Sequence, residues 1–195
     1  KFKLRELVED GVGILKVGPG LTFGAREGIF WLCMIEEELA AVYGFETSHF
    51  REELDKAMLA NPGKWAPYYH GTENEIAFKR KYSFSDRCRY YLPQENVKNA
   101  LAKLLSNLKE HPVPLPLLSQ YMPFQYTLVR EGKLNNTPED LIKARVMYTI
   151  EEYDKEKSKV LKYVLYKKRS KKEVQNKFYN AIENEMLHDI IEELE

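Results

Sequence analysis

The sequence predicts a mainly α-helical protein with one short strand. Apolar residues recur at the three- to four-residue spacing of amphipathic helices through most of the chain. Only residues 14–17, Ile-Leu-Lys-Val, form a convincing strand. Because an isolated strand is not stable, we expect this one to pair with strands from a part of the protein that this chain lacks, or from another subunit.

Length, composition and charge limit the class of protein. The chain has 195 residues, the size of one ordinary domain or of a piece of a larger protein. Its 30 basic and 30 acidic residues cancel, so there is no electrostatic reason to expect nucleic acid or an anionic membrane as a partner. The longest apolar stretch, 29–35, is far shorter than the roughly 20 residues that cross a bilayer. The charged N-terminus lacks the apolar region of a secretory signal. It also lacks methionine, so we expect the chain to start inside a longer protein.

Cysteine and histidine usage predicts a cytoplasmic protein without a metal site of its own. Cys33 and Cys88 do not make a disulfide framework, and we interpret both as reduced thiols. The four histidines are widely scattered, and none has a histidine or cysteine at metal-ligand spacing. We therefore expect no metal or other cofactor in this chain.

The first elements are predicted from apolar patterns and turn residues. Residues 2–10 have one apolar side and are followed by glycines that end a helix. The stretch 25–42 is apolar all round in its middle, which indicates a helix buried on most sides. Residues 48–60 open with Ser48 and carry an acidic residue close to the capping-box position, so a capped helix is predicted. Turn residues and exposed aromatics make 61–75 a loop.

Prolines divide the middle of the chain. The helix predicted over 74–91 is interrupted near 82–85 and is stopped by Pro93. Residues 95–109 place their valine, leucines and an alanine on one face, which is typical of an amphipathic helix. After a proline-rich extended stretch, helix is predicted to resume near residue 117 and to continue over 117–130.

The C-terminal third contains two predicted helices. In the stretch NNTPED, Thr137 is a cap, the next proline fits the first turn, and the acids favour the positive end of the helix dipole. That helix is predicted over 138–166. A last helix over 170–194 repeats apolar residues every fourth position, with lysines crowding 155–177 and carboxylates crowding 183–195. We expect its apolar stripe to pack on the rest of the chain, and a partner helix is the alternative.

The first candidate site follows the predicted strand. Gly18, Gly20 and Thr22 lie in a glycine–proline–glycine turn before a helix, an order that can cradle a phosphate. Lys16 in the strand and Arg26 in the helix could contact the same phosphate or a carboxylate. The alternative is a plain turn, with Lys16 paired to an acid and Arg26 clamping the chain. The proline removes one N–H, and the pattern matches neither the P-loop nor the dinucleotide fingerprint.

The second candidate site is the stretch YSFSDRCRYY, residues 82–91. It concentrates Asp86, Arg87, Arg89 and Tyr90, and arginines with tyrosines are suited to anion binding or to a protein interface. An ion-paired, solvated helix face is the alternative. No paired carboxylates, Ser–His–Asp set or Cys–His set can be assembled from the chain. We therefore predict no catalytic residue, and an enzyme wholly contained in this chain is not supported.

Four stretches together resemble one family. KVGPGLTFGAREGIFWLCMIEEEL, YSFSDRCRYYLP, PVPLPLLSQYMPFQY and TPEDLI, in this order, are similar to the non-catalytic (GatZ/KbaZ-type) subunits of class II D-tagatose-1,6-bisphosphate aldolases. The resemblance covers residues 1–153. It implies a (β/α)8 TIM-type barrel followed by a helical C-terminal region. This chain would then contain the last βα unit of the barrel in 1–45, the helical region in 46–154, and a lysine-rich stretch with a last helix in 155–195.

The resemblance also implies a role. Such subunits support the activity and stability of a separate catalytic aldolase subunit, which uses zinc to cleave the sugar bisphosphate in galactitol- or N-acetylgalactosamine-type catabolism. The expected partner is that catalytic subunit, with a homo-oligomer and a sugar phosphate as further partners. One alternative is a sugar-phosphate-binding enzyme, aldolase-like or a tagatose-6-phosphate kinase, as some members have been labelled. Another is a helical oligomerisation module.

One departure from the related catalytic enzymes concerns the first candidate site. Those enzymes carry a strand ending of the form Lys-Val-Asn-Val-Ala-Thr, which binds substrate phosphate. Lys16 and Val17 agree with this pattern, but Gly18 stands where the asparagine would be. The resemblance therefore leaves an inherited phosphate site open, whereas inherited aldolase chemistry at this strand is not expected.

Overall fold

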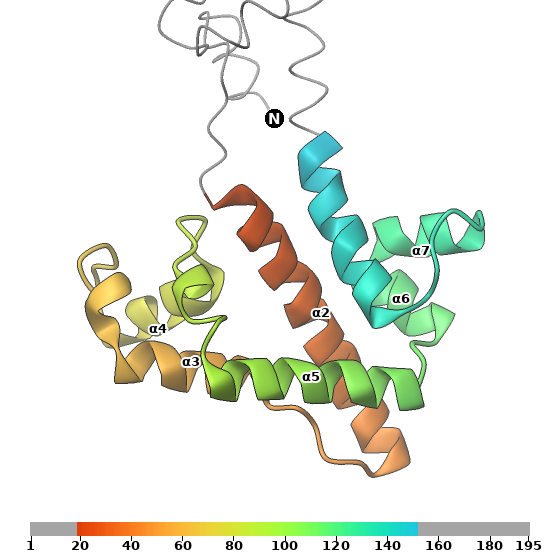
Figure 1. The fold of residues 1–195 in the computed structure, drawn as a ribbon, viewed down its shortest axis with the longest axis horizontal. Helices are drawn as coiled ribbons and strands as arrows, with labels where there is room; N and C mark the ends of the chain where they lie inside the picture. The colour runs from red at the N-terminus through yellow and green to blue at the C-terminus, as the bar shows by residue number, and fades with distance from the viewer. Residues whose placement is uncertain (1–18, 152–195) are drawn as a thin grey trace, which may run out of the picture. The chain divides into compact units, whose positions relative to one another are not determined.

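The computed structural model describes residues 19–151 (Figure 1). Contacts divide the chain into two units, and one of them, Pro19–Met147, lies wholly within the described residues; we call it the helical unit. No strand occurs among the described residues. The predicted helix 2–10, strand 14–17 and helix 170–194 lie outside them.

The helices agree with the mainly helical prediction. In chain order they are α2 (Gly20–Tyr43), α3 (Phe50–Ala60), the short 3-10 helix η1 (Pro62–Lys64), α4 (Glu73–Tyr82), the 3-10 helix η2 (Cys88–Tyr90), α5 (Glu95–Glu110), α6 (Leu115–Tyr121) and α7 (Pro123–Arg130). A further helix occupies residues 138–151 and reaches the end of the described residues. It starts where NNTPED predicted, because the Thr137 hydroxyl accepts a hydrogen bond from the backbone N–H of Asp140 at 3.3 Å.

The long helix α2 is the centre of the helical unit. It packs against α3, α5, α6 and η2 (Figure 1). Buried residues occur all round its middle, as predicted: Ile29, Phe30, Leu32, Cys33 and Ile35. α2 begins at Gly20, earlier than predicted, because the Pro19 carbonyl accepts the backbone N–H of Phe23 at 2.7 Å. It ends at Tyr43, and the following Gly44 caps it with a φ of 76°, the left-handed conformation that glycine adopts most readily.

The helix of residues 138–151 approaches α2 closely at Gly28. A Cβ placed on Gly28 would lie 3.4 Å from the Ile142 Cα and 3.5 Å from the Arg145 Cβ, so only a very small residue fits without displacing the neighbour. One position earlier on α2, the carboxylate of Glu27 accepts two hydrogen bonds from the Arg145 guanidinium, at 2.5 and 3.0 Å. Two segments 118 residues apart are thus joined by close backbone packing and an ion pair.

The amphipathic helix α5 confirms the prediction for 95–109. Its apolar face is buried against α3 and α2 through Val97, Ala100, Leu104 and Leu108. The same face contributes to one continuous apolar core that includes residues of α2, α3, η2 and α6. Burial of this face, rather than helix propensity alone, is what stabilises the helix.

Two predicted helices are divided in the structure. The helix predicted over 74–91 ends at Tyr82, since Ser83 is extended (φ −63°, ψ 136°), and only the short η2 follows. The break near 82–85 was therefore predicted, whereas the helix beyond it was wrong. The helix predicted over 117–130 is also divided into α6 and α7. Pro123 cannot donate the hydrogen bond that a continuous helix requires, and it disfavours helical backbone at the preceding Met122.

The predicted cap of the helix over 48–60 was wrong. The N-cap of α3 is His49, which has a positive φ of 51° and makes no side-chain cap hydrogen bond. Ser48 instead donates its hydroxyl hydrogen to the carboxylate of Glu36 on α2, at 2.6 Å. The Ser48 hydroxyl also accepts the backbone N–H of Phe50, but only at 3.4 Å, so its bond to the charged carboxylate is the stronger contact.

Candidate functional site

Two residues of the first candidate site, Gly20 and Thr22, belong to the first turn of α2. Gly20 is the first residue of this helix, and the Thr22 hydroxyl donates to the Pro19 carbonyl at 3.0 Å. Lys16 and Gly18 lie outside the described residues. The phosphate site at this turn therefore stays a prediction.

Arg26 and Asp86, one from each candidate site, meet in the interior. Arg26 Nε donates to Asp86 Oδ2 at 3.2 Å, and their side chains are only 4% and 1% exposed. The other oxygen of Asp86 accepts the backbone N–H of Cys88 at 2.9 Å. The Arg26 guanidinium also lies over the rings of Phe23 and Phe30, at 4.6 and 5.3 Å from their centroids. This ion pair holds the segment before η2 against α2.

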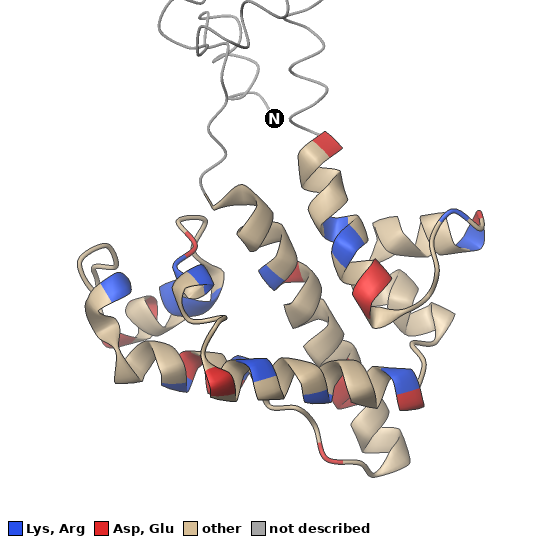
Figure 2. Cartoon of the chain, viewed as in Figure 1, with Lys and Arg blue, Asp and Glu red and all other residues tan. Residues whose placement is uncertain are grey.

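The other residues of the second candidate site form a surface cluster with one residue of η1 and one of the turn that follows it. We call Lys64, Tyr68, Arg87, Arg89 and Tyr90 the basic–tyrosine cluster; Figure 2 shows basic residues in the segment that carries η2. The Arg87 guanidinium lies 3.4 Å from the ring centroid of Tyr68. Arg89 donates to the Tyr90 hydroxyl at 2.8 Å and to the Asp86 carbonyl at 2.7 Å. Lys64 Nζ lies 5.8 Å from the Tyr90 ring centroid.

The neighbouring arginines change the pKa of the Tyr90 phenol. The hydrogen bond from Arg89 lowers the pKa of the Tyr90 phenol, and the positive charges of Arg89 and Arg87 lower it further. The Nε of Arg87 is buried and has no hydrogen-bond partner among the described residues. Lys64 and Tyr68 were not part of the predicted site, because nothing in their local sequence shows that the turn after η1 folds beside η2.

A buried carboxylate on α2 was also missed. Glu36 is 1% exposed and accepts three hydrogen bonds: from the Ser48 backbone N–H at 2.9 Å, from the Ser48 hydroxyl at 2.6 Å and from the Asn107 side-chain amide at 2.6 Å. No ion pair to Glu36 occurs among the described residues. The apolar periodicity of α2, which places residue 36 on the same face as Leu32 and Cys33, is the signal that could have indicated its burial.

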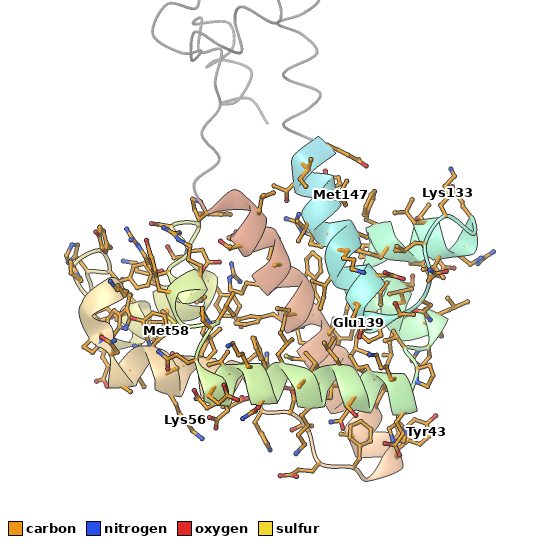
Figure 3. The ribbon with its side chains drawn as sticks, viewed as in Figure 1. Tyr43, Lys56, Met58, Lys133, Glu139 and Met147 are labelled. Carbon is orange, nitrogen blue, oxygen red and sulfur yellow. The ribbon has the colours of Figure 1, made fainter. Side chains whose placement is uncertain are left out.

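Cys33 and Cys88 are both buried. Both are free thiols, which agrees with the prediction that they are reduced. Burial raises the pKa of the Cys33 thiol, and the charge of Glu36 adds to the rise. Burial likewise raises the pKa of the Cys88 thiol, whose sulfur contacts the Met58 sulfur at 3.8 Å (Figure 3 labels Met58). Since the thiolate is the reactive form, neither side chain is suited to nucleophilic catalysis at neutral pH.

This burial leads to a prediction about reactivity. We expect the thiol reagent DTNB at pH 8 to label neither Cys33 nor Cys88 in the native chain and to label both in denaturant, because unfolding restores access and an ordinary pKa. The measurement is the release of the coloured thiolate product with time. Rapid stoichiometric labelling without denaturant would contradict the buried positions.

The described part of the chain contains neither a cluster of metal ligands nor a membrane span. Between residues 19 and 151, no three histidine, cysteine, aspartate or glutamate side chains come together as metal ligands. Within the same range, no helix has both the length and the apolar content that a membrane span requires.

Comparison with known proteins relates this chain to one family. This chain is similar to the crystal structure of a probable tagatose 6 phosphate kinase from Sinorhizobium meliloti 1021, with 36% sequence identity and a TM-score of 0.69. The match covers 78% of this chain and only 39% of that one, so this chain spans well under half the length of its solved relative. A family model described as D-tagatose-1,6-bisphosphate aldolase subunit GatZ/KbaZ-like matches residues 1–158. The chain therefore belongs to the GatZ/KbaZ-like family of D-tagatose-1,6-bisphosphate aldolase subunits.

Proposed function

We propose that this chain is part of an accessory, non-catalytic subunit that supports the activity and stability of a class II tagatose-1,6-bisphosphate aldolase in the cytoplasm. The family description as an aldolase subunit supports this role. In this proposal the zinc and the cleavage chemistry belong to the catalytic partner. The pathway would be sugar catabolism of the galactitol or N-acetylgalactosamine type.

The proposal extends to the fold of the longer protein. In it, α2 is the last helix of a (β/α)8 barrel, and residues 14–17 supply the strand before it. The partial coverage of the solved relative supports this view, because a chain that matches 39% of a longer structure contains only a part of its fold. The residues from 46 onward would then form the helical region that follows the barrel.

The buried charges of the helical unit support a scaffolding role. Arg80 donates two hydrogen bonds to Asp55, at 2.7 and 3.0 Å, and thereby joins α4 to α3. Arg26 and Glu36 likewise join α2 to segments distant in the sequence. Charged side chains that are paired in this way hold the helices in one arrangement.

The observation that carries the proposal is a row of aromatic rings that ends at the surface, which we call the aromatic row. Phe84 stacks on Phe23 at 5.5 Å between centroids, and Tyr82 meets Phe30 edge-on at 6.0 Å and Phe78 at 5.2 Å. The guanidinium of Arg26 connects the two halves of the row, as described above. Phe84 is 85% exposed and Phe78 is 62% exposed. Large exposed aromatic side chains of this kind are typical of protein interfaces.

Co-purification with the catalytic aldolase subunit tests the proposal. We expect the 195-residue chain to hold the aldolase on an affinity column, and the double variant Phe78→Ser, Phe84→Ser to hold less of it. Val42→Ser is the matched control, because Val42 is 74% exposed but lies at the other end of α2. Failure of the unchanged chain to hold the aldolase, or equal losses in the control, would contradict the proposal.

A second candidate function is sugar-phosphate binding by the protein itself. The description of the solved relative as a probable tagatose 6 phosphate kinase favours it. A thermal shift screen with tagatose 6-phosphate and with the bisphosphate tests this second candidate. Stabilisation by either sugar phosphate without any aldolase present would support it, and no stabilisation by either would contradict it.

A further inference from the structure

The basic–tyrosine cluster is a concentration of positive charge that no carboxylate between residues 19 and 151 neutralises. Elsewhere among the described residues, most arginines have a carboxylate partner: Arg26 has Asp86, Arg51 has Glu37, Arg80 has Asp55 and Arg145 has Glu27. Within the same residues, Lys64, Arg87 and Arg89 form no ion pair. The nearest carboxylate in the sequence, Asp86, has both oxygens engaged with Arg26 and the backbone of Cys88. Like charges held together in this way attract an anion.

The phenol oxygen of Tyr90 lies within the concentrated positive charge, and an anionic oxygen would lie beside it. The phenol oxygen accepts a hydrogen bond from Arg89 at 2.8 Å. The hydrogen bond and the charge of Arg89 lower the pKa of this phenol, and the positive charge of Arg87 adds to the same effect. Two guanidinium groups therefore act on one point, as they do around the oxygens of a bound phosphate or carboxylate.

The arginines are held in place before any ligand arrives. Arg87 is stacked on the ring of Tyr68, which leaves the edge of its guanidinium plane for hydrogen bonding. Arg89 is fixed by its bond to the Asp86 carbonyl, and Asp86 is itself anchored in the interior. Side chains that are already ordered lose little entropy when they bind a ligand, so such a site binds more tightly than free arginines would.

We propose that the basic–tyrosine cluster binds the phosphate group of a small molecule. In this site Arg87 and Arg89 donate hydrogen bonds to the phosphate oxygens, Lys64 supplies a third positive charge, and the Tyr90 hydroxyl donates its hydrogen. Three cations complement a doubly charged phosphate better than a singly charged carboxylate. The cations converge on one phenol rather than following a stripe, which favours a single compact anion over an acidic protein surface. The proposal is independent of any aldolase partner.

Isothermal titration calorimetry with inorganic phosphate and with glycerol 1-phosphate tests the site, at an ionic strength kept constant with sodium chloride. We expect the 195-residue chain to bind at least one of the two. Arg87→Gln and Arg89→Gln should each weaken binding by about tenfold, because each removes a charged hydrogen bond to the ligand. The stronger of the two probes shows whether the site takes free phosphate or a phosphate ester.

Two further variants keep the result interpretable. Arg130→Gln is the matched control, since Arg130 also donates to a tyrosine, Tyr126, at 2.8 Å and has no carboxylate partner among the described residues. We expect binding within about twofold of the unchanged chain in this control. Lys64→Gln weakens binding without affecting the fold, because Lys64 is exposed and forms no hydrogen bond through its side chain within the described residues.

Three results would overturn the proposal. The first is no heat of binding with either probe at constant ionic strength. The second is an equal loss of phosphate affinity in Arg130→Gln and Arg87→Gln, which would indicate that any positive charge on the chain attracts phosphate. The third is binding of polyglutamate, but of neither phosphate probe, that depends on Arg87; this outcome would assign the cluster to an acidic protein surface.

Discussion

Asp86→Ala is expected to lower the free energy of unfolding by about 3–5 kcal/mol. The change leaves the Arg26 guanidinium buried without its carboxylate, and it removes the acceptor of the Cys88 backbone N–H. Removing one partner of a buried ion pair is far more damaging than removing both, because the remaining charge has lost its compensation. Urea unfolding followed by the fluorescence of Trp31 and Trp65 measures the loss.

Two controls separate this effect from a general sensitivity of α2. Glu37→Ala breaks the ion pair between Glu37 and Arg51, whose side chains are 48% and 24% exposed, and should reduce stability by less than about 1 kcal/mol. The double variant Arg26→Met, Asp86→Asn removes both charges and keeps a side-chain oxygen for the Cys88 N–H, so it should be more stable than Asp86→Ala. A double variant as unstable as Asp86→Ala would contradict the buried-charge explanation.

Glu36→Ala is expected to reduce stability by about 3 kcal/mol. The three hydrogen bonds that Glu36 accepts join α2 to Ser48, just before α3, and to Asn107 on α5. Alanine leaves the buried Ser48 backbone N–H without its acceptor, and the half-buried Asn107 amide keeps only its hydrogen bond to the Glu46 carbonyl. The midpoint of urea unfolding, compared with that of the unchanged chain, measures this contribution.

Glu36→Gln is the matched variant for this site. Its amide oxygen can accept the hydrogen bonds of the Ser48 N–H and of Asn107, while its NH2 group donates to the Ser48 hydroxyl oxygen. The geometry is retained and only the charge is lost, so we expect a loss of about 1 kcal/mol. Equal losses in the glutamine and alanine variants would show that the negative charge matters more than the hydrogen-bond geometry.

The helices that were predicted well are those with a strong local signal. The apolar face of α5 follows directly from a helical period within one segment. The start of the helix at residue 138 follows from a threonine cap next to a proline. In both cases the residues that decide the structure lie within a few positions of one another.

The wrong predictions arose where distant residues or a competing local rule decided the structure. Ser48 had the right position for a cap, but a carboxylate 12 residues earlier on α2 accepted its hydrogen bonds. In the stretch around Pro123, apolar residues at helical spacing favoured one continuous helix, and the backbone constraint of the proline divided it.

The second candidate site was predictable only as far as its residues are neighbours in the sequence. The concentration of Arg87, Arg89 and Tyr90 is a local feature of the sequence and was recognised. The pairing of Arg26 with Asp86 joins residues 60 positions apart, and composition alone gave no indication that one candidate residue would neutralise another. The contribution of Lys64 depends likewise on a turn that folds against η2.

The accessory role is tested most directly by the half-life of the catalytic aldolase's activity. The catalytic subunit is incubated at a temperature at which it slowly loses activity, with and without the 195-residue chain, and bisphosphate cleavage is assayed over time. The proposed function predicts a longer half-life with the chain, and the double variant Phe78→Ser, Phe84→Ser should provide less protection than Val42→Ser. An identical half-life with and without the unchanged chain would contradict the proposed function.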